Sequence, residues 1–213
     1  MITALTLVAS VAVAPIQQQP ALIKVSFDQK SIQPKDGDEV AIIKTSAGQM
    51  VAMFFDSVAP LHVANFKGLA TKGFYDGIRF HRCIPGFMIQ GGDPNSKNLN
   101  APDTWGYGSA TDSNGNRTSV DAEFSELKHL RGVLSMARSS DPNSASSQFF
   151  IMHADYPTLD GKYSAFGKVI QGLEVIDEIV KTGPTDRELN GKVPANKAIV
   201  IESIKLAKWP LTN

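Results

Sequence analysis

Apolar and polar positions alternate from Glu39 onwards in a pattern typical of β-strands. Residues 39–45 and 49–55 are both rich in β-branched and other apolar residues. The small residues Ser46, Ala47 and Gly48 separate the two runs and form a turn sequence. The pattern therefore predicts a β-hairpin.

Two other segments have apolar residues at helical spacing. The first begins at Pro60, whose fixed φ suits the first position of a helix, and ends before Gly73. The second covers residues 173–181, and the dipeptide Gly183-Pro184 follows it. We expect one short amphipathic helix at each place.

Shorter apolar runs, separated by Gly, Pro, Asn and Asp, predict further strands. They are residues 78–80, 87–90, 132–136, 148–152, 164–169 and 198–206. Many short strands with frequent turns are typical of a β-barrel or a β-sandwich. Two helices could cover the open ends of such a barrel.

Residues 93–124 interrupt this regular pattern. They are rich in Asn, Asp, Gly, Ser and Thr, and a loop of this length in a compact domain is usually functional or mobile. Residues 112–116 partly resemble a calcium loop, but the glycine after the third ligand and the distal glutamate are missing. We do not expect calcium binding there.

The first residues indicate export from the cytoplasm. Residues 2–14 are nearly all apolar or small, too short to cross a bilayer but long enough for a signal peptide. Ala12-Val13-Ala14 fits a small-x-small cleavage site, although no Lys or Arg precedes the run and Pro15 follows it. We expect a periplasmic or other extracytoplasmic location. A buried strand or a misassigned start would instead leave the protein in the cytoplasm.

The composition of the chain limits the kinds of partner and cofactor that we expect. The chain has 21 Lys+Arg against 21 Asp+Glu, so no basic excess favours nucleic acid or an anionic membrane surface. The single cysteine excludes an intramolecular disulfide, and four histidines without ligand spacing do not predict a metal site. We expect a monomer with no metal, no cofactor and no stable membrane association.

Three segments, residues 80–93, 132–151 and 159–169, combine large apolar groups with isolated polar ones. Alternation along a strand would put Met88 and Gln90 on one face. If Arg82 shares that face, the result is an apolar pocket with a guanidinium group at its rim. Each Phe or Met taken alone is an ordinary core residue, whereas buried Arg82 and Gln90 would need polar partners.

Residues 80–93 carry the intact motif Phe-His-Arg-x-Ile-Pro-Gly-Phe-Met-x-Gln-Gly-Gly-Asp. With the other two segments, it resembles the signature of the cyclophilin family of peptidyl-prolyl cis–trans isomerases, from about Glu39 to Leu206. The resemblance implies a closed eight-stranded antiparallel β-barrel capped by two α-helices. The expected organisation is a leader and linker at 1–20, an extension at 21–38, the isomerase domain at 39–208 and a tail at 209–213.

The resemblance also implies roles for individual residues. Arg82 is the expected catalytic residue, and the substrates are proline-containing polypeptides. The expected substrate-binding residues are the proline-pocket group Phe87, Met88, Phe150 and Leu159, the backbone-binding group Gln90, Ala137 and Arg138, and His81, Gln148 and Tyr163.

Two positions depart from the family pattern. Thr158 stands where a tryptophan commonly precedes the Leu-Asp-Gly stretch, and Tyr163 stands at the pocket histidine, as in many bacterial-type members. Loss of the indole removes a large apolar contact and an N–H donor together. We therefore expect weakened binding of cyclosporin-type macrocycles.

Two other functions would use the same residues differently. A proline-binding chaperone module would keep the pocket and have little turnover. A hydrolase would pair Cys83 or a serine with a histidine. Cys83 lies close to His81-Arg82, but its immediate neighbour Arg82 faces the opposite side of a strand, and we do not expect a catalytic pair here.

Overall fold

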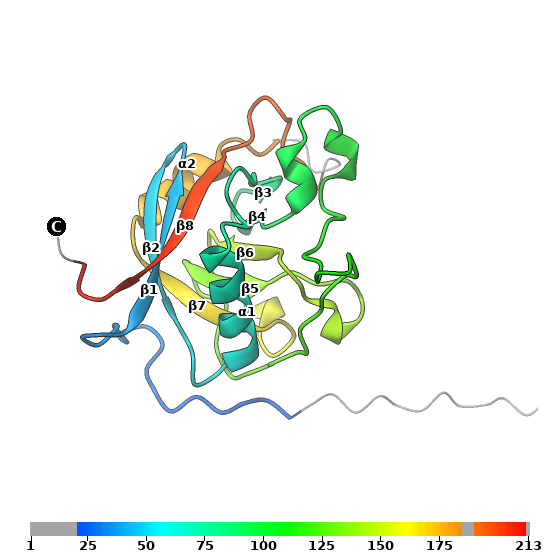
Figure 1. The fold of residues 1–213 in the computed structure, drawn as a ribbon. Coiled ribbons are helices and arrows are strands. Elements are labelled where there is room, and N and C mark those ends of the chain that lie inside the picture. Colours follow the sequence, from blue (N-terminus) through cyan, green and yellow to red (C-terminus); the bar gives the residue numbers. More distant parts are fainter. Residues whose placement is uncertain (1–20, 185–189, 212–213) are drawn as a thin grey trace, which may run out of the picture.

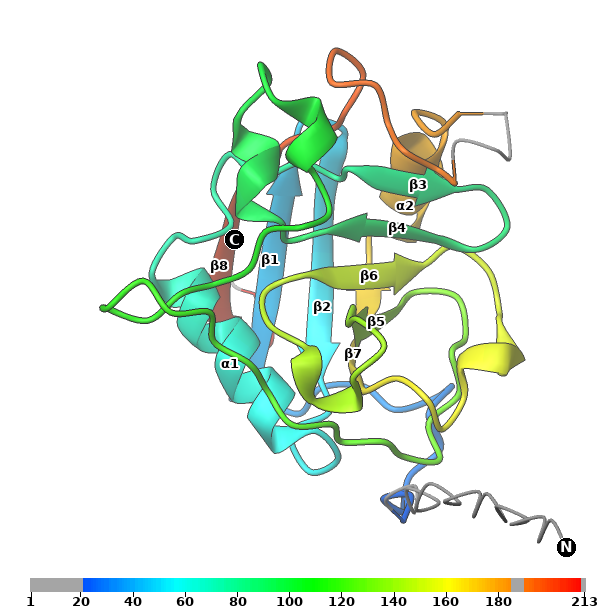
Figure 2. The same cartoon turned by 90° about the vertical axis from the view of Figure 1, so that its right-hand side faces the viewer.

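A computed structural model of the chain describes residues 21–184 and 190–211. The predicted signal peptide lies outside the described residues. Eight antiparallel strands form one curled sheet in the order β3-β4-β6-β5-β7-β2-β1-β8 (Figures 1 and 2). Their bounds are β1 Glu39–Thr45, β2 Gly48–Phe54, β3 Arg82–Ile84, β4 Met88–Gly91, β5 Val133–Met136, β6 Phe149–Met152, β7 Ala165–Gln171 and β8 Ile201–Lys208.

The N-terminal hairpin is confirmed as predicted from the sequence. β1 and β2 pair in register from Val40 opposite Met53 to Thr45 opposite Gly48. The Thr45 hydroxyl donates to the Gly48 carbonyl at 2.7 Å and accepts from the Ala47 N–H at 3.1 Å, which closes the turn. The hairpin therefore follows from local turn chemistry and alternation.

The apolar run at residues 78–80 is not a strand, although its side chains belong to the core. Ile78 and Phe80 are fully buried. Their backbone bonds run to the segment around β8, where Phe80 N–H donates to the Ile199 carbonyl and Ile201 N–H to the Ile78 carbonyl. The strand in this region comes later, at β3, and β8 begins three residues later than predicted.

The expectation of a closed barrel is wrong. The sheet is a curled half-barrel, and among the described residues no ladder joins its edge strands β3 and β8. β3 has only three residues, and its outer edge is taken by a single bridge between Arg82 and Lys192. One further bridge, between Arg79 and Val200, lies near the gap. The two edge strands thus contact irregular segments of the chain and do not pair with each other.

Both predicted helices are present, α1 at Pro60–Thr71 and α2 at Leu173–Val180. They lie at opposite sides of the sheet (Figures 1 and 2). α1 buries Phe66, whose ring lies between 5.1 and 5.9 Å from the rings of Phe54, Tyr75, Phe149 and Phe166. α2 buries an apolar face made of Val175, Ile176, Ile179 and Val180. The helices therefore seal the main core on its two sides.

Residues 93–124 are ordered by hydrogen bonds of their own. They contain the short 3-10 turns Pro94–Lys97 and Pro102–Thr104. Asp112 uses its carboxylate to accept the N–H groups of Asn114 and Asn116, closing a tight turn. The carboxylate of Asp112, the acidic group in the calcium-like sequence, is thus already hydrogen-bonded to backbone N–H groups.

No helix within 21–184 or 190–211 is both long enough and apolar enough to cross a membrane.

Candidate functional site

A cavity of about 110 Å³ opens beside β3, β4 and β6. The nine residues that line it are all site candidates from the sequence: Arg82, Phe87, Met88, Gln90, Ala137, Arg138, Phe150, Leu159 and Tyr163. They come from three strands, from the turn between β3 and β4, and from the loops after β5 and before β7. The fold therefore gathers residues that are up to 81 positions apart in the chain (163 − 82). Their individual roles stay predictions at this point.

The floor of the cavity is apolar and belongs to a second core cluster. Met88 and Phe150 are 1% and 5% exposed and pack with Leu127, Val133 and Met152. Phe87, Leu159 and Tyr163 are partly buried at the rim. The Tyr163 ring meets the Phe150 ring edge-on at 5.7 Å. A small apolar ring could enter here and lose its water.

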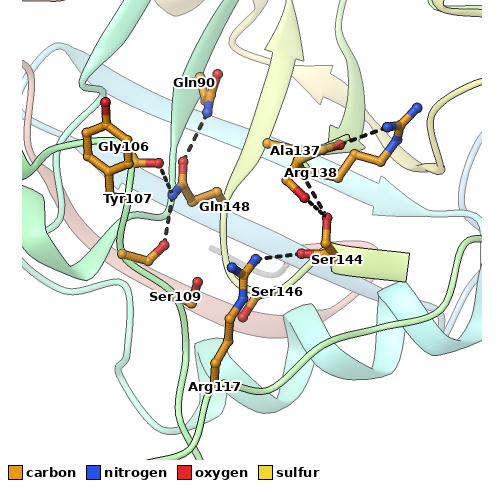
Figure 3. Close-up of a pocket in the computed structure, with 12 residues that line it drawn as sticks. Gln90, Gly106, Tyr107, Ser109, Arg117, Ala137, Arg138, Ser144, Ser146 and Gln148 are labelled. Carbon is orange, nitrogen blue, oxygen red and sulfur yellow. Dashed lines mark hydrogen bonds between the residues drawn. The ribbon is translucent and has the colours of Figure 1, made fainter. Parts of the chain in front are cut away.

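Arg82 lies at the polar side of the cavity, opposite Gln90 in the β3–β4 ladder. Its Nη1 donates to Gln90 Oε1 at 3.3 Å. Gln90 Nε2 donates in turn to Gln148 Oε1 at 3.0 Å. Gln148 Nε2 donates to the carbonyls of Gly106 and Gly108 at 3.0 and 2.8 Å (Figure 3). The backbone carbonyls therefore fix the orientation of the Gln148 amide, and Gln148 fixes that of Gln90, because only the NH2 end of an amide can donate.

Asn190 is a site residue that the sequence reasoning missed. Its backbone carbonyl accepts from Arg82 Nε and its side-chain Oδ1 accepts from Arg82 Nη2, both at 2.9 Å. It has a φ of 46°, a conformation that asparagine tolerates better than most residues. Asn190-Gly191 is a recognisable turn sequence, but nothing local relates it to an arginine 108 positions away.

The Arg82 guanidinium is held in a half-buried position with donors to spare. Burial lowers the pKa of Arg82 from its usual value, but a guanidinium remains protonated in proteins. Three of its five N–H groups have partners among the described residues. The side chain is thus both charged and fixed in direction.

Two predicted site residues do not line this cavity: Gln148, which contacts it through Gln90, and His81. His81 is 4% exposed. Burial lowers the pKa of its imidazole to about 4, despite the opposing charge of Asp93. The ring is therefore neutral and lies behind the strand that carries Arg82.

The geometry gives no support to a hydrolase. Cys83 is fully buried in the main core, and burial raises the pKa of its thiol to about 12. His129 does contact both Asp160, Nδ1 to Oδ1 at 3.2 Å, and Ser135, Nε2 to Oγ at 3.0 Å. Ser135 is completely buried, however, so this serine cannot meet a substrate. His129 instead supports the wall formed by Phe150 and Tyr163, which its ring faces.

Within the described parts of the chain, no three His, Cys, Asp or Glu side chains are arranged to hold a metal ion. Thr158 is exposed in the short turn Pro157–Leu159 beside the cavity. The weakened binding of cyclosporin-type macrocycles stays a prediction.

Known proteins share the sequence over nearly the whole sheet. The profile of the family described as "Cyclophilin type peptidyl-prolyl cis-trans isomerase/CLD" matches residues 40–206. A Brucella abortus protein named "Probable peptidyl-prolyl cis-trans isomerase" is 39% identical over 172 residues, covering 80% of this chain and 84% of the relative. The "Peptidyl-prolyl cis-trans isomerase A" of Dickeya dadantii is 40% identical over 173 residues, covering 78% and 84%.

The fold has solved counterparts as well. A cyclophilin type peptidyl-prolyl cis-trans isomerase from Cryptosporidium parvum, crystallised in the presence of the dipeptide Ala-Pro, superposes with a TM-score of 0.66 at 35% identity. That comparison covers 79% of this chain and 99% of the other. The cyclophilin AquaCyp293 from Hirschia baltica has a TM-score of 0.60 at 25% identity, covering 85% and 81%.

Proposed function

The chain belongs to the cyclophilin-type peptidyl-prolyl cis–trans isomerase family, and from this premise we propose that Arg82 is the catalytic group of an isomerase acting on proline-containing polypeptides. The observation that carries the proposal is the fixed, charged guanidinium at the rim of a small apolar cavity. A binding module with little turnover is not favoured, because the arginine is in place and the relatives are named isomerases.

The reaction needs no covalent step. A peptide bond resists rotation with a barrier of about 18–20 kcal/mol because of its C–N double-bond character. Uncatalysed X-Pro exchange takes tens to hundreds of seconds. Shortening the exchange time from about 100 s to about 1 ms requires the barrier to fall by about 7 kcal/mol. Any arrangement of groups that stabilises the twisted bond more than both planar forms supplies part of this reduction in the barrier.

In the proposed mechanism, Arg82 stabilises the twisted bond. The N–H groups not used by Gln90 and Asn190 donate to the substrate carbonyl or to the pyramidal proline nitrogen. The lone pair of that nitrogen becomes available only when the bond twists, so the interaction is stronger in the transition state than in either ground state.

The apolar residues hold the proline ring and exclude water. Met88 and Phe150 are already buried and need little rearrangement to accept the ring. Exclusion of water lowers the local dielectric, which strengthens the contact with Arg82. Gln90 and the backbone near Ala137 would hold the chain on one side of the bond, so that rotation occurs on the other side.

The test is the exchange rate of an Ala-Pro-Phe peptide, measured by NMR with wild-type protein, Arg82→Ala and Arg82→Lys. We expect kcat/KM to fall about 10²-fold or more in Arg82→Ala, as for the loss of one preorganised donor. Lysine keeps the charge but not the planar set of donors, so Arg82→Lys recovers little. Lys205→Ala, an exposed change on β8, is the control. Undiminished catalysis by Arg82→Ala would overturn the assignment.

A further inference from the structure

Figure 3 shows the residues that line a second cavity, of about 310 Å³, which has wall residues in common with the apolar one. The two share Gln90, Ala137 and Arg138 in their walls. A polypeptide whose proline occupies the apolar cavity therefore has neighbouring residues within reach of the second cavity. The lining of the second cavity includes four serines, residues 106–108 and the side chains of Arg117 and Gln148.

The charges along this groove are all of one sign. Among the described residues, the linings of the two cavities contain Arg82, Arg117 and Arg138 and no aspartate or glutamate. None of these three arginines forms an ion pair within the described parts of the chain. The chain as a whole has balanced charges, so this is a local excess and not a general one.

The buried carboxylate of Asp93 is not accessible to a ligand in the groove. Asp93 is fully buried behind the segment that carries Gly106. Its two oxygens accept the backbone N–H groups of Asn95 and Gly106. It is absent from both linings within the described residues, so it faces the protein interior.

Of the two arginines that line the second cavity, Arg117 has the more donors free to meet a ligand. It lies at the end of the tight turn that Asp112 closes, where Thr111 bridges Arg117. Figure 3 shows its side chain extending along the cavity toward Ser144. Among the described residues its only hydrogen bond is from Nη2 to the Ser144 carbonyl, at 2.7 Å. The remaining guanidinium N–H groups therefore have no acceptor within the described structure.

Arg138 contributes charge from a fixed position. It donates to the carbonyls of Ser139, Ser140 and Lys162 and lies over the Tyr163 ring at 4.6 Å. Carbonyl acceptors hold the guanidinium in place without cancelling its charge. The positive potential at the junction of the two cavities is therefore a built feature of the groove.

We propose that the second cavity binds an acidic side chain, aspartate or glutamate, of the same polypeptide whose proline occupies the apolar cavity, with Arg117 as the specificity-determining residue. This inference rests on the proposed function, and it names the substrate class of that site. A carboxylate offers the acceptors that Arg117 lacks, and planar guanidinium groups bind carboxylates well. Lysine at the same substrate position meets three positive charges.

The experiment uses the full chain and a set of proline peptides. Each peptide carries a single test residue, which is Glu, Gln or Lys. The test residue is placed in turn at each of the three positions before proline and the three positions after it, and all other positions are alanine or phenylalanine. Both kcat/KM, from NMR exchange, and the dissociation constant, from titration, are measured. At one or two positions we expect Glu to exceed Lys by about fivefold or more in kcat/KM, the size of a partly exposed ion pair. The difference shrinks in high salt.

Charge reversal supplies the decisive variant. Arg117→Glu is expected to invert the preference, so that the Lys peptide exceeds the Glu peptide at the same position. Lys205→Glu makes the same change in net charge on exposed β8, far along the sheet order from the cavity strands, and is expected to keep the wild-type preference. Circular dichroism of both variants verifies the fold.

The outcomes separate the two proposals. Equal rates and equal affinities for Glu, Gln and Lys peptides at every position overturn the acidic subsite, while the isomerase function stands. A Glu preference in affinity without any acceleration of exchange overturns the isomerase function and supports the subsite. A Glu preference that survives unchanged in Arg117→Glu shows that Arg117 does not determine it.

Discussion

Arg82 owes its direction to a residue far away in the sequence. Asn190 accepts two of its hydrogen bonds, one through the backbone carbonyl and one through the side chain, each at 2.9 Å. Gln90 accepts a third at 3.3 Å. Fixing an arginine side chain in one conformation costs considerable rotamer entropy. Here the three hydrogen bonds offset this cost within the protein itself. We therefore interpret Asn190 as a positioning residue that prepares the guanidinium before substrate arrives.

Replacement of Asn190 tests this interpretation. Asn190→Gly removes the side-chain acceptor and still permits the positive φ of 46°, and we expect kcat to fall about fivefold with KM little changed. Asn190→Asp retains an acceptor and should recover most of kcat. A purely structural role would lower stability without this split between kcat and KM. An Asn190→Gly protein with wild-type kcat would contradict the interpretation.

At the scale of elements, helix α1 has no cap from its own sequence. Ala59 precedes it and offers no side-chain acceptor, and no acidic residue lies in its first turn. Glu123 takes this role from a distant loop, accepting the N–H groups of Leu61 and His62 at 3.0 and 2.9 Å. His62 Nδ1 also lies 2.6 Å from the same carboxylate. One buried carboxylate therefore joins the loop to the positive end of the helix.

Loss of this carboxylate should destabilise the fold. Burial lowers the pKa of His62, while the hydrogen bond between its Nδ1 and Glu123 acts in the opposite direction. In Glu123→Gln one acceptor oxygen is replaced by an amide NH2 group that faces N–H donors, and we expect the free energy of unfolding to fall by about 2 kcal/mol. Urea unfolding followed by circular dichroism measures it. Asp36→Asn changes an exposed carboxylate that has no hydrogen bond or ion pair among the described residues; it is the control and should change little. Equal stability of the two variants would exclude the capping role.

At the scale of the whole molecule, residues 21–38 are packed against the domain. Their exposure alternates in the manner of a strand, and Ile23 forms a parallel bridge with Ser125. Phe27 stacks on Phe55 with ring centres 5.6 Å apart. Lys168 fixes the segment from the other side by donating to two of its carbonyls, those of Gln29 and Lys30. This arm extends the same core cluster that forms the floor of the apolar cavity.

The arm should therefore contribute to global stability. Phe27→Ala removes a half-buried ring, and we expect the free energy of unfolding to fall by about 2 kcal/mol. Lys24→Ala, an exposed position on the same arm, is the control. Denaturant unfolding of both variants measures the difference. If Phe27→Ala unfolds at the same denaturant concentration as Lys24→Ala, the arm is a passive attachment.

The sequence alone determined the features that depend on neighbouring residues. The hairpin of β1 and β2 follows from alternation and a small-residue turn, and α1 and α2 from spacing and their Pro and Gly boundaries. Resemblance over residues 80–93 predicted a pocket beside Arg82, and the structure places Arg82 and Met88 on adjoining strands at one cavity. Such signals lie within one element or one turn, where periodicity and backbone chemistry act directly.

Only the tertiary structure decided the features that depend on distant contacts. The open sheet edge at β3, the cap of α1 by Glu123 and the fixing of Arg82 by Asn190 each join segments with no shared local pattern. His81 belongs to the motif yet lies outside the cavity, since its side chain is buried behind the strand. Which polar groups become partners depends on how the chain packs, and packing is a property of the whole fold.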